Sequence, residues 1–108
     1  MAHYLLAVLE QVERDAVRLR GAYVHTNRNP LGACAITGTG FDIDRDLTSD
    51  LLGFSAPTVN TYGSIATIDY LLESASSAMV LVTGMGRFIQ DLLLWSTSEF
   101  DYVRLGDG

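Results

Sequence analysis

The sequence predicts an all-α protein, a segment of a bundle of long helices, and three observations support this fold class. Apolar residues in the N-terminal part recur at steps of three and four, which is the period of an α-helix. The segment from about residue 64 to 98 contains no proline and is apolar along most of its length. Both prolines and several glycines fall between these two segments, where they predict loops.

The first helix is expected from about residue 3 to residue 20. Its apolar stripe consists of Leu5, Leu9, Val12, Ala16 and Leu19. The other side carries Glu10, Glu13, Arg14, Asp15 and Arg18. This pattern indicates one face that packs against protein and one face that meets water.

A loop over residues 26–43 leads to a short helix at about 45–52, and a second loop follows over residues 53–63. Asp44 or Asp46 can cap the short helix, because a carboxylate there accepts hydrogen bonds from free backbone N–H groups. Gly53 can end it, because glycine readily adopts the left-handed conformation of a helix C-terminus.

The last segment is predicted to form one long helix from about residue 64 to 98. Its large apolar residues are Ile65, Ile68, Leu71, Leu72, Met79, Leu81, Val82, Met85, Phe88, Ile89, Leu92 and Trp95. About 34 helical residues at about 1.5 Å each span about 50 Å, whereas a compact domain of this size is roughly 35 Å across. Because the helix is apolar nearly all round, other helices must cover it, either from the same protein or from other subunits.

Composition excludes several classes of function. The 108 residues carry a formal charge of −6, and all seven basic residues are arginines, so nucleic-acid binding along a basic stripe is not expected. Cys34 is the single cysteine, which excludes an internal disulfide and a cysteine-based zinc site. The N-terminus lacks the basic region of a signal peptide, and the longest uncharged apolar stretch, residues 74–86, is shorter than a membrane span. These features predict a cytoplasmic protein without nucleic-acid or membrane partners.

The stretch FDIDRDLTSD, residues 41–50, places Asp42, Asp44 and Asp46 like the first ligands of a calcium loop. It fails where the geometry of such a loop is strictest, because Leu47 occupies the glycine position and Gly53 the bidentate glutamate position. An acidic helix N-terminus explains the spacing better, so no metal site is predicted. His3 and His25 lie at opposite ends of the first helical region, where an exposed or hydrogen-bonding role is expected for each.

The stretch NTYGS, residues 60–64, stands at the predicted start of the long helix. Free N–H groups and the positive end of the helix dipole favour an anion there. Asn60, Tyr62 and Ser64 are therefore the candidate substrate-binding residues, with a carboxylate as the expected ligand. The alternative is an ordinary helix start capped by Asn60 or Ser64.

The stretch NRNPLGACAITGTGFDIDRDLTSDLLGF, residues 27–54, resembles a pattern of argininosuccinate lyase and its relatives in the aspartase/fumarase superfamily. That pattern runs N-x-x-P-L-G, small residues, a glycine, D-R and a short leucine-rich helix. The resemblance continues through Asn60 and Asp69, and the closing DLLLWSTSEFDYVRLGDG is similar to the family's LxLWSSxEFxxVxLxD. On this resemblance Asp44 and Arg45 belong to the turn that leads into the short helix.

The resemblance implies a homotetramer whose long helices form a shared core, with each active site built from three subunits. It also implies a cofactor-free elimination, in which a base removes a proton beside a carboxylate and an amine leaves to give fumarate. Argininosuccinate would yield arginine and fumarate. Such chemistry needs a placed acid and base, and donors for the charge of the aci-carboxylate intermediate.

The family's threonine–histidine motif, T-H-x-Q-x-A-Q-P, would precede residue 2, and its serine loop, S-S-x-M-P-x-K-x-N, would follow residue 108. The segment contains neither motif, so it is expected to be inactive alone and no catalytic residue is assigned to it. Gly63 and Ile68 replace the aspartate and arginine of the family's NSxDAxSxRDF. The alternatives are therefore a lyase for another aminosuccinate or aminopolycarboxylate, or a non-catalytic helical oligomerisation protein.

Overall fold

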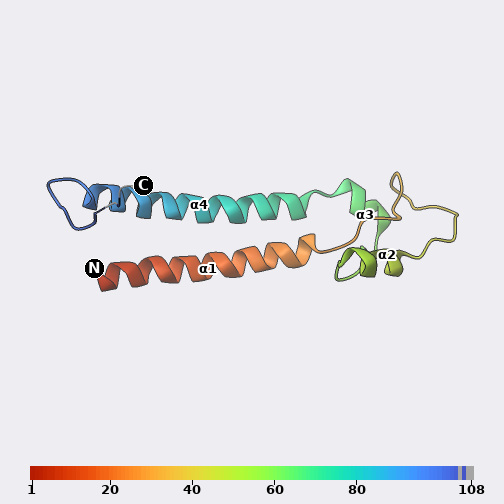
Figure 1. Cartoon of the computed structure of the whole chain (residues 1–108). Helices are drawn as coiled ribbons and strands as arrows, with labels where there is room; N and C mark the ends of the chain where they lie inside the picture. The colour runs from red at the N-terminus through yellow and green to blue at the C-terminus, as the bar shows by residue number, and fades with distance from the viewer. Residues whose placement is uncertain (105, 107–108) are drawn as a thin grey trace.

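The computed structural model describes residues 1–104 and 106, and this part of the chain is helical without strands. Its four helices are α1 (Ala2–Thr26), α2 (Arg45–Leu52), α3 (Thr61–Ala66) and α4 (Asp69–Trp95). α1 and α4 lie side by side and run in opposite directions, while α2 and α3 both lie beyond one end of the pair (Figure 1).

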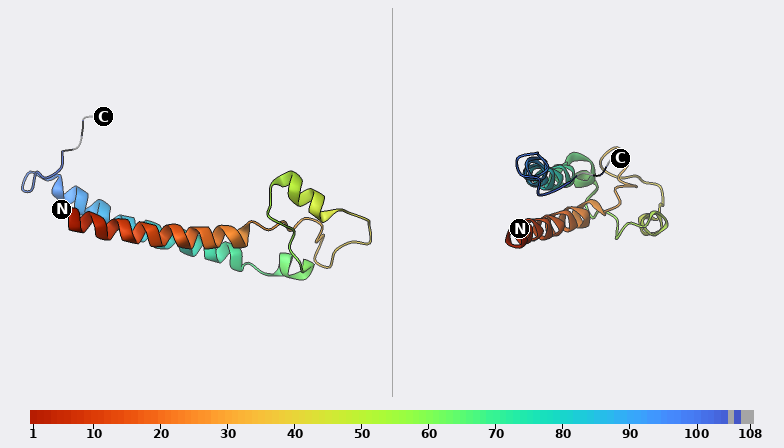
Figure 2. Two further views of the ribbon diagram at one scale, coloured as in Figure 1. Left: turned by 90° about the horizontal axis from the view of Figure 1, so that it is seen from below. Right: turned by 60° about the vertical axis from the view of Figure 1, so that its left-hand side comes forward.

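The molecule is a rod rather than a globule (Figure 2). Its principal extents are 71 × 25 × 22 Å and its radius of gyration is 21.6 Å, against about 13 Å for a compact domain of about 100 residues. The long helices therefore extend well beyond any core that this chain builds around them.

α1 ends at Thr26 and not near residue 20, so the predicted boundary was wrong. Gly21 does not end the helix, and Ala22 directly after it is buried. The helix stops at Asn27, whose backbone N–H donates to the Tyr23 carbonyl 2.8 Å away. Pro30 follows shortly afterwards and prevents its continuation.

α2 occupies the residues where the sequence places the short helix. Of the two candidate caps Asp44 is the one used, because its Oδ1 accepts from the Leu47 backbone N–H at 2.8 Å. Gly53 ends the helix in the left-handed conformation with φ 76°.

The prediction of one helix from about 64 to 98 was wrong at both ends. Thr67 is extended, with φ −101° and ψ 142°, and this separates the six-residue α3 from α4. Its hydroxyl donates to the Gly63 carbonyl at 2.7 Å, and two adjacent β-branched residues, Thr67 and Ile68, disfavour a continuous helix. At the other end Ser96 and Thr97 turn their hydroxyls back onto the carbonyls of the last turn.

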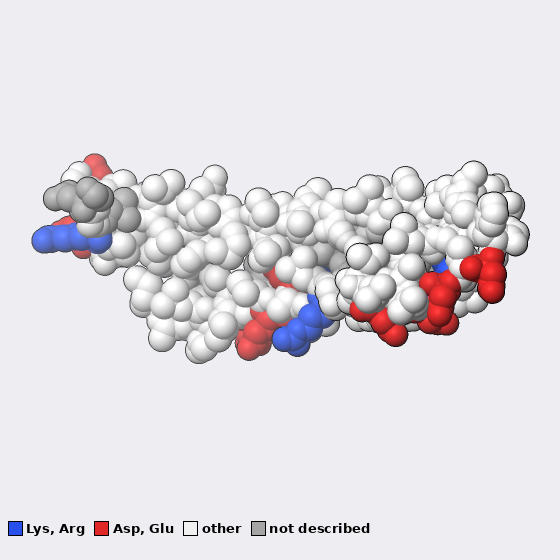
Figure 3. Space-filling model, turned by 45° about the vertical axis from the view of Figure 1, so that its right-hand side comes forward, with Lys and Arg blue, Asp and Glu red and all other residues white. Residues whose placement is uncertain are grey.

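The contact between α1 and α4 leaves most of their apolar surface uncovered. Near the N-terminus Tyr4 donates to the Asp91 carboxylate and packs edge-on against Trp95, with ring centroids 5.1 Å apart. Only 6% of the most apolar 18-residue window of α4 is buried. Figure 3 shows a face with few charged side chains along the paired helices and acidic side chains gathered at the end that carries α2.

By length and composition alone, α4 could cross a membrane, which the uncharged stretch 74–86 did not predict. The two results differ because a membrane-spanning helix can carry charged residues near its ends, so the apolar segment of α4 is longer than the uncharged stretch 74–86. The core helix of a soluble bundle has the same length and composition. Within the described residues most of the surface of α4 is uncovered.

Candidate functional site

A pocket of about 590 Å³ lies at the end of the rod where α1 ends and α4 begins. Residues from α1, both loops, α3 and α4 contribute to its wall. They are Val24, His25, Thr26, Arg28, Pro30, Phe54, Thr58, Asn60, Gly63, Ser64, Thr67, Asp69 and Tyr70.

The fully buried side chain of Asn29 anchors the loops beneath this pocket. Its Nδ2 donates to Thr48 Oγ1 at 3.1 Å and to Ser49 Oγ at 3.0 Å, both on α2. Its Oδ1 accepts from the Leu31 backbone N–H at 3.0 Å. Every polar atom of the buried amide thus has a partner, and the first loop is fixed to α2.

Arg45 connects the two loops from the first turn of α2. Its Nε donates to the Leu31 carbonyl at 2.9 Å and its Nη2 to Thr58 Oγ1 at 3.0 Å. Its aliphatic carbons pack on Gly32, where φ is +83° and a Cβ atom would lie 2.8 Å from Arg45 Cγ. The acidic stretch therefore serves local structure, with Asp44 capping α2 and Arg45 holding the loops together.

The stretch NTYGS begins the short helix α3 and not the long helix, so the predicted dipole of a long helix is absent there. Asn60 is an ordinary cap, because its Oδ1 accepts from the Gly63 N–H at 2.9 Å. The hydroxyl of Ser64 donates to the Asn60 carbonyl at 2.9 Å and also contacts Thr58 Oγ1. Asn60 and Ser64 line the pocket, whereas Tyr62 is 59% exposed and lies outside its wall.

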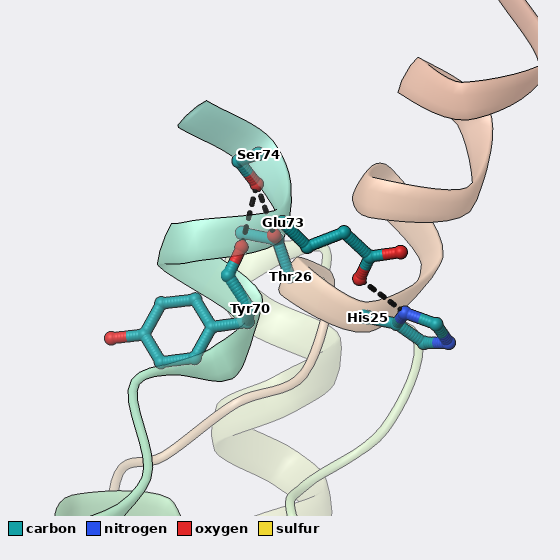
Figure 4. A network of polar contacts seen from close by, with 5 residues as sticks. All are labelled: His25, Thr26, Tyr70, Glu73 and Ser74. Atoms are coloured by element: carbon teal, nitrogen blue, oxygen red, sulfur yellow. Dashed lines mark hydrogen bonds and ion pairs between the residues drawn. The ribbon is translucent and has the colours of Figure 1, made fainter. Parts of the chain in front are cut away.

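Two polar contacts join α1 to α4 at the edge of the pocket (Figure 4). His25 Nδ1 lies 2.6 Å from Glu73 Oε2, which confirms the hydrogen-bonding role expected for this histidine. Thr26 Oγ1 and Ser74 Oγ are 3.1 Å apart, and Ser74 also donates to the Tyr70 carbonyl at 2.8 Å. These contacts fix where the two long helices diverge and so fix the width of the pocket.

Ionisable residues in the pocket wall are Arg28, His25 and Asp69. Asp69 lies in the first turn of α4, where the positive end of the helix dipole offsets its charge. Within the described residues the Arg28 guanidinium has no hydrogen bond or ion pair. Sequence reasoning missed both Arg28 and Asn29, although their place in a short extended segment before Pro30 was a signal that the two side chains point to opposite sides.

Comparison with known proteins gives a consistent set of matches. The family model described as lyase matches residues 1–107. The argininosuccinate lyase of Hyphomonas neptunium is 41% identical over 107 residues, which are 99% of this chain and 23% of that protein. The argininosuccinate lyase of Methanocorpusculum labreanum is 44% identical over 107 residues, 22% of its length.

Among solved structures, EDDS lyase in complex with formate superposes with a TM-score of 0.89 and 38% identity. The match covers 96% of this chain and 21% of that chain. An EDDS lyase variant with bound fumarate gives the same values. This chain thus spans about a fifth of the length of the proteins that it matches.

Proposed function

This chain belongs to the lyase family and has the fold of a segment of the aspartase/fumarase long-helix bundle, and on that premise we propose that it is part of a carbon–nitrogen lyase. The lyase eliminates fumarate from an N-substituted aspartate, and argininosuccinate is the first candidate substrate. The observation that carries this proposal is the 41–44% identity to argininosuccinate lyases over nearly the whole chain.

The reaction breaks one C–H bond beside a carboxylate and the C–N bond on the neighbouring carbon. A double bond forms between the two carbons, and the amine leaves with a proton from a general acid. This segment supplies no catalytic acid or base in the proposal. Asn60 and Ser64 position the substrate from the pocket wall, while exposed Tyr62 contacts it only where another segment or subunit closes over α3.

The proposed assembly is a cytoplasmic homotetramer in which α1 and α4 pack into a shared helical core. The apolar side chains that these helices expose support it, because no segment among the described residues covers them. In this arrangement α4 lies in the middle of protein and not in a membrane. No cofactor is required, since the elimination moves only protons and an electron pair.

Fumarate release tests the proposal directly. The purified native protein is expected to raise the ultraviolet absorbance of fumarate when argininosuccinate is added, and its intact mass is expected to exceed the 11.8 kDa of this chain. A native product of that mass that assembles stably and releases no fumarate from any N-substituted aspartate contradicts the lyase proposal. That outcome favours the non-catalytic oligomerisation protein.

A second candidate is a lyase of the same superfamily that releases another amine. Gly63 and Ile68 stand where the resemblance places an aspartate and an arginine, and Gly63 lines the pocket without a side chain. The similarity to EDDS lyase also favours a lyase that releases another amine. A panel of N-substituted aspartates distinguishes this candidate from the first, because fumarate is the common product whatever the amine.

A further inference from the structure

The backbone on either side of Arg28 is held in place by hydrogen bonds. The Arg28 N–H donates to the Thr26 carbonyl at 2.8 Å. The Asn29 N–H donates to the Ala56 carbonyl at 2.9 Å, and the Asn29 carbonyl accepts from the Thr58 N–H at 2.9 Å. The segment therefore pairs with the second loop like one step of a parallel β-bridge, which involves Asn29 and Pro57.

This pairing decides where the Arg28 side chain goes. In an extended segment successive side chains point to opposite sides. Asn29 points down into the loops and binds α2, so Arg28 points away from α2 and forms part of the pocket wall. The guanidinium is thus presented to the pocket by a fixed backbone and not by a mobile loop.

Among the described residues, no charged group near the pocket forms an ion pair with Arg28. The Glu73 carboxylate is engaged by His25 at 2.6 Å. The dipole of α4 partly offsets the charge of Asp69, which lies in the first turn of that helix. Gly63 contributes no charge, and within the described residues no acid pairs with Arg28. A ligand that enters the pocket therefore meets a cation with free donors.

We propose that Arg28 binds a carboxylate on the amine portion of the substrate, so that the enzyme prefers N-substituted aspartates whose amine carries an acidic group. This inference rests on the proposed lyase function and assigns the substrate class within it. A guanidinium donates two parallel hydrogen bonds to a carboxylate, a geometry that neither a neutral nor a cationic substituent can use. A pocket of about 590 Å³ has room for such a substituent.

The test compares three substrates of similar size in the native protein. N-carboxymethylaspartate carries an acidic amine substituent, N-methylaspartate a neutral one and N-(2-aminoethyl)aspartate a cationic one without a carboxylate. The wild-type protein is expected to favour the carboxymethyl compound over the methyl compound in kcat/KM by about tenfold or more, the range of a charge-assisted hydrogen bond. Arg28→Gln is expected to remove this preference while leaving the methyl compound nearly unchanged.

Two further variants separate the role of Arg28 from a general effect on folding. Arg28→Lys keeps the charge but loses the planar pair of donors, so it is expected to retain part of the preference. Arg14→Gln changes an exposed arginine of α1 that lies outside the pocket and is expected to leave all three substrates unaffected. Equal losses on all three substrates in Arg28→Gln, or no loss on any, overturn the inference.

Binding without turnover keeps the inference testable if the proposed reaction is wrong. Tricarballylate resembles succinate with an added carboxymethyl group, and calorimetry can compare the two ligands. Tighter binding of tricarballylate to wild-type protein, weakened about tenfold or more by Arg28→Gln, supports the anion site even if no substrate releases fumarate. Equal binding of both ligands to wild type and Arg28→Gln overturns it, whereas fumarate release from none of the substrates refutes only the lyase proposal.

Discussion

The side-chain amide of Gln11 on α1 occupies the space beside Gly84 on α4 in which any larger residue would place its Cβ atom. The two helices thus interlock at this point of their contact. Gly86, one half-turn further on the same helix, has no atom within 4 Å of its Cβ position. A larger residue therefore meets a neighbour at Gly84 but not at Gly86, and the free energy of unfolding of substituted variants can measure this difference.

Gly86→Ala is expected to stabilise the folded chain by up to about 1 kcal/mol, because alanine favours a helix interior over glycine. Gly84→Ala gains the same propensity but must expel the Gln11 side chain, so its net effect is expected to be near zero or destabilising. Denaturant unfolding of both variants checks this. Combining Gly84→Ala with Gln11→Ala is expected to restore the gain, and an additive double mutant contradicts the interlock.

Much of the helical pattern could be predicted because it is local. Asp44 and Gly53 mark the two ends of α2 with caps that involve only the neighbouring turn. The break at Thr67 was not predicted, because the apolar period runs through it and the two adjacent β-branched residues are only a weak signal against a helix. The end of α1 was missed because the contacts of its last turn, His25 with Glu73 and Thr26 with Ser74, join residues far apart in the sequence.

The pocket was predictable only in part, because it is assembled from segments that meet through non-local hydrogen bonds. Asn60 and Ser64 are close in sequence and were identified together. Arg28 joins them only because Asn29 ties the first loop to α2 and to the second loop. Tyr62 was grouped with them by sequence distance, although one helical step turns its side chain away from the pocket wall.

Asn29→Ala is expected to lower the free energy of unfolding by about 2–4 kcal/mol at the end of the rod that carries the two loops and α2. It removes three side-chain hydrogen bonds and leaves buried groups without partners. Hydrogen exchange of α2 amides and denaturant unfolding both report this loss. The matched variant Asn27→Ala removes two exposed hydrogen bonds and is expected to cost less than about 1 kcal/mol. Similar costs for the two variants would contradict the anchoring role of Asn29.

Tyr4 is expected to keep its proton above pH 10. Its pKa is raised from 10.0, first because its hydroxyl donates to Asp91, then through desolvation and the charge of Asp91, while Arg87 opposes the shift. Because the folded pKa is raised, the stabilisation is fully present below pH 10.0 and is lost as pH rises through the folded pKa. Ultraviolet titration of tyrosine ionisation, with Tyr4→Phe for assignment, measures this pKa.

The variant Asp91→Asn tests whether Asp91 causes the raised pKa of Tyr4. It removes the carboxylate while keeping a hydrogen-bond acceptor, so the pKa of Tyr4 is expected to fall towards its ordinary value. A Tyr4 that ionises at or below pH 10.0 in the unmodified chain contradicts the contact between the two helices.

The assembly proposal predicts that a charge on the uncovered face of α4 prevents oligomer formation. Val82 is 69% exposed in the isolated chain, and its burial in a shared core makes Val82→Asp costly, because a buried carboxylate without a partner is strongly unfavourable. Analytical ultracentrifugation is expected to show smaller species for this variant. Val59→Asp, on a loop where the side chain is 100% exposed, is the control, and an oligomer unchanged by Val82→Asp excludes this face from the interface.

Gly63 offers a way to reverse the charge preference of the pocket. A Cβ atom there meets only Asn60 at 3.7 Å or more, so the Cβ atom of either Gly63→Ala or Gly63→Asp displaces no neighbour. The aspartate adds a negative charge to the wall that Arg28 lines, and the first turn of a helix tolerates it well. Gly63→Asp is therefore expected to move the kcat/KM ratio from the acidic towards the cationic amine substituent by about tenfold or more.

The alanine variant separates charge from shape in that experiment. Gly63→Ala adds the Cβ atom without the carboxylate, so it is expected to leave the ratio between N-carboxymethylaspartate and N-(2-aminoethyl)aspartate close to that of the wild type. Because the reaction is the same for both substrates, the ratio reports recognition of the amine portion and not the rate of the chemical step. An equal change of the ratio in both variants means that the size of residue 63, and not the balance of charge around Arg28, selects the amine.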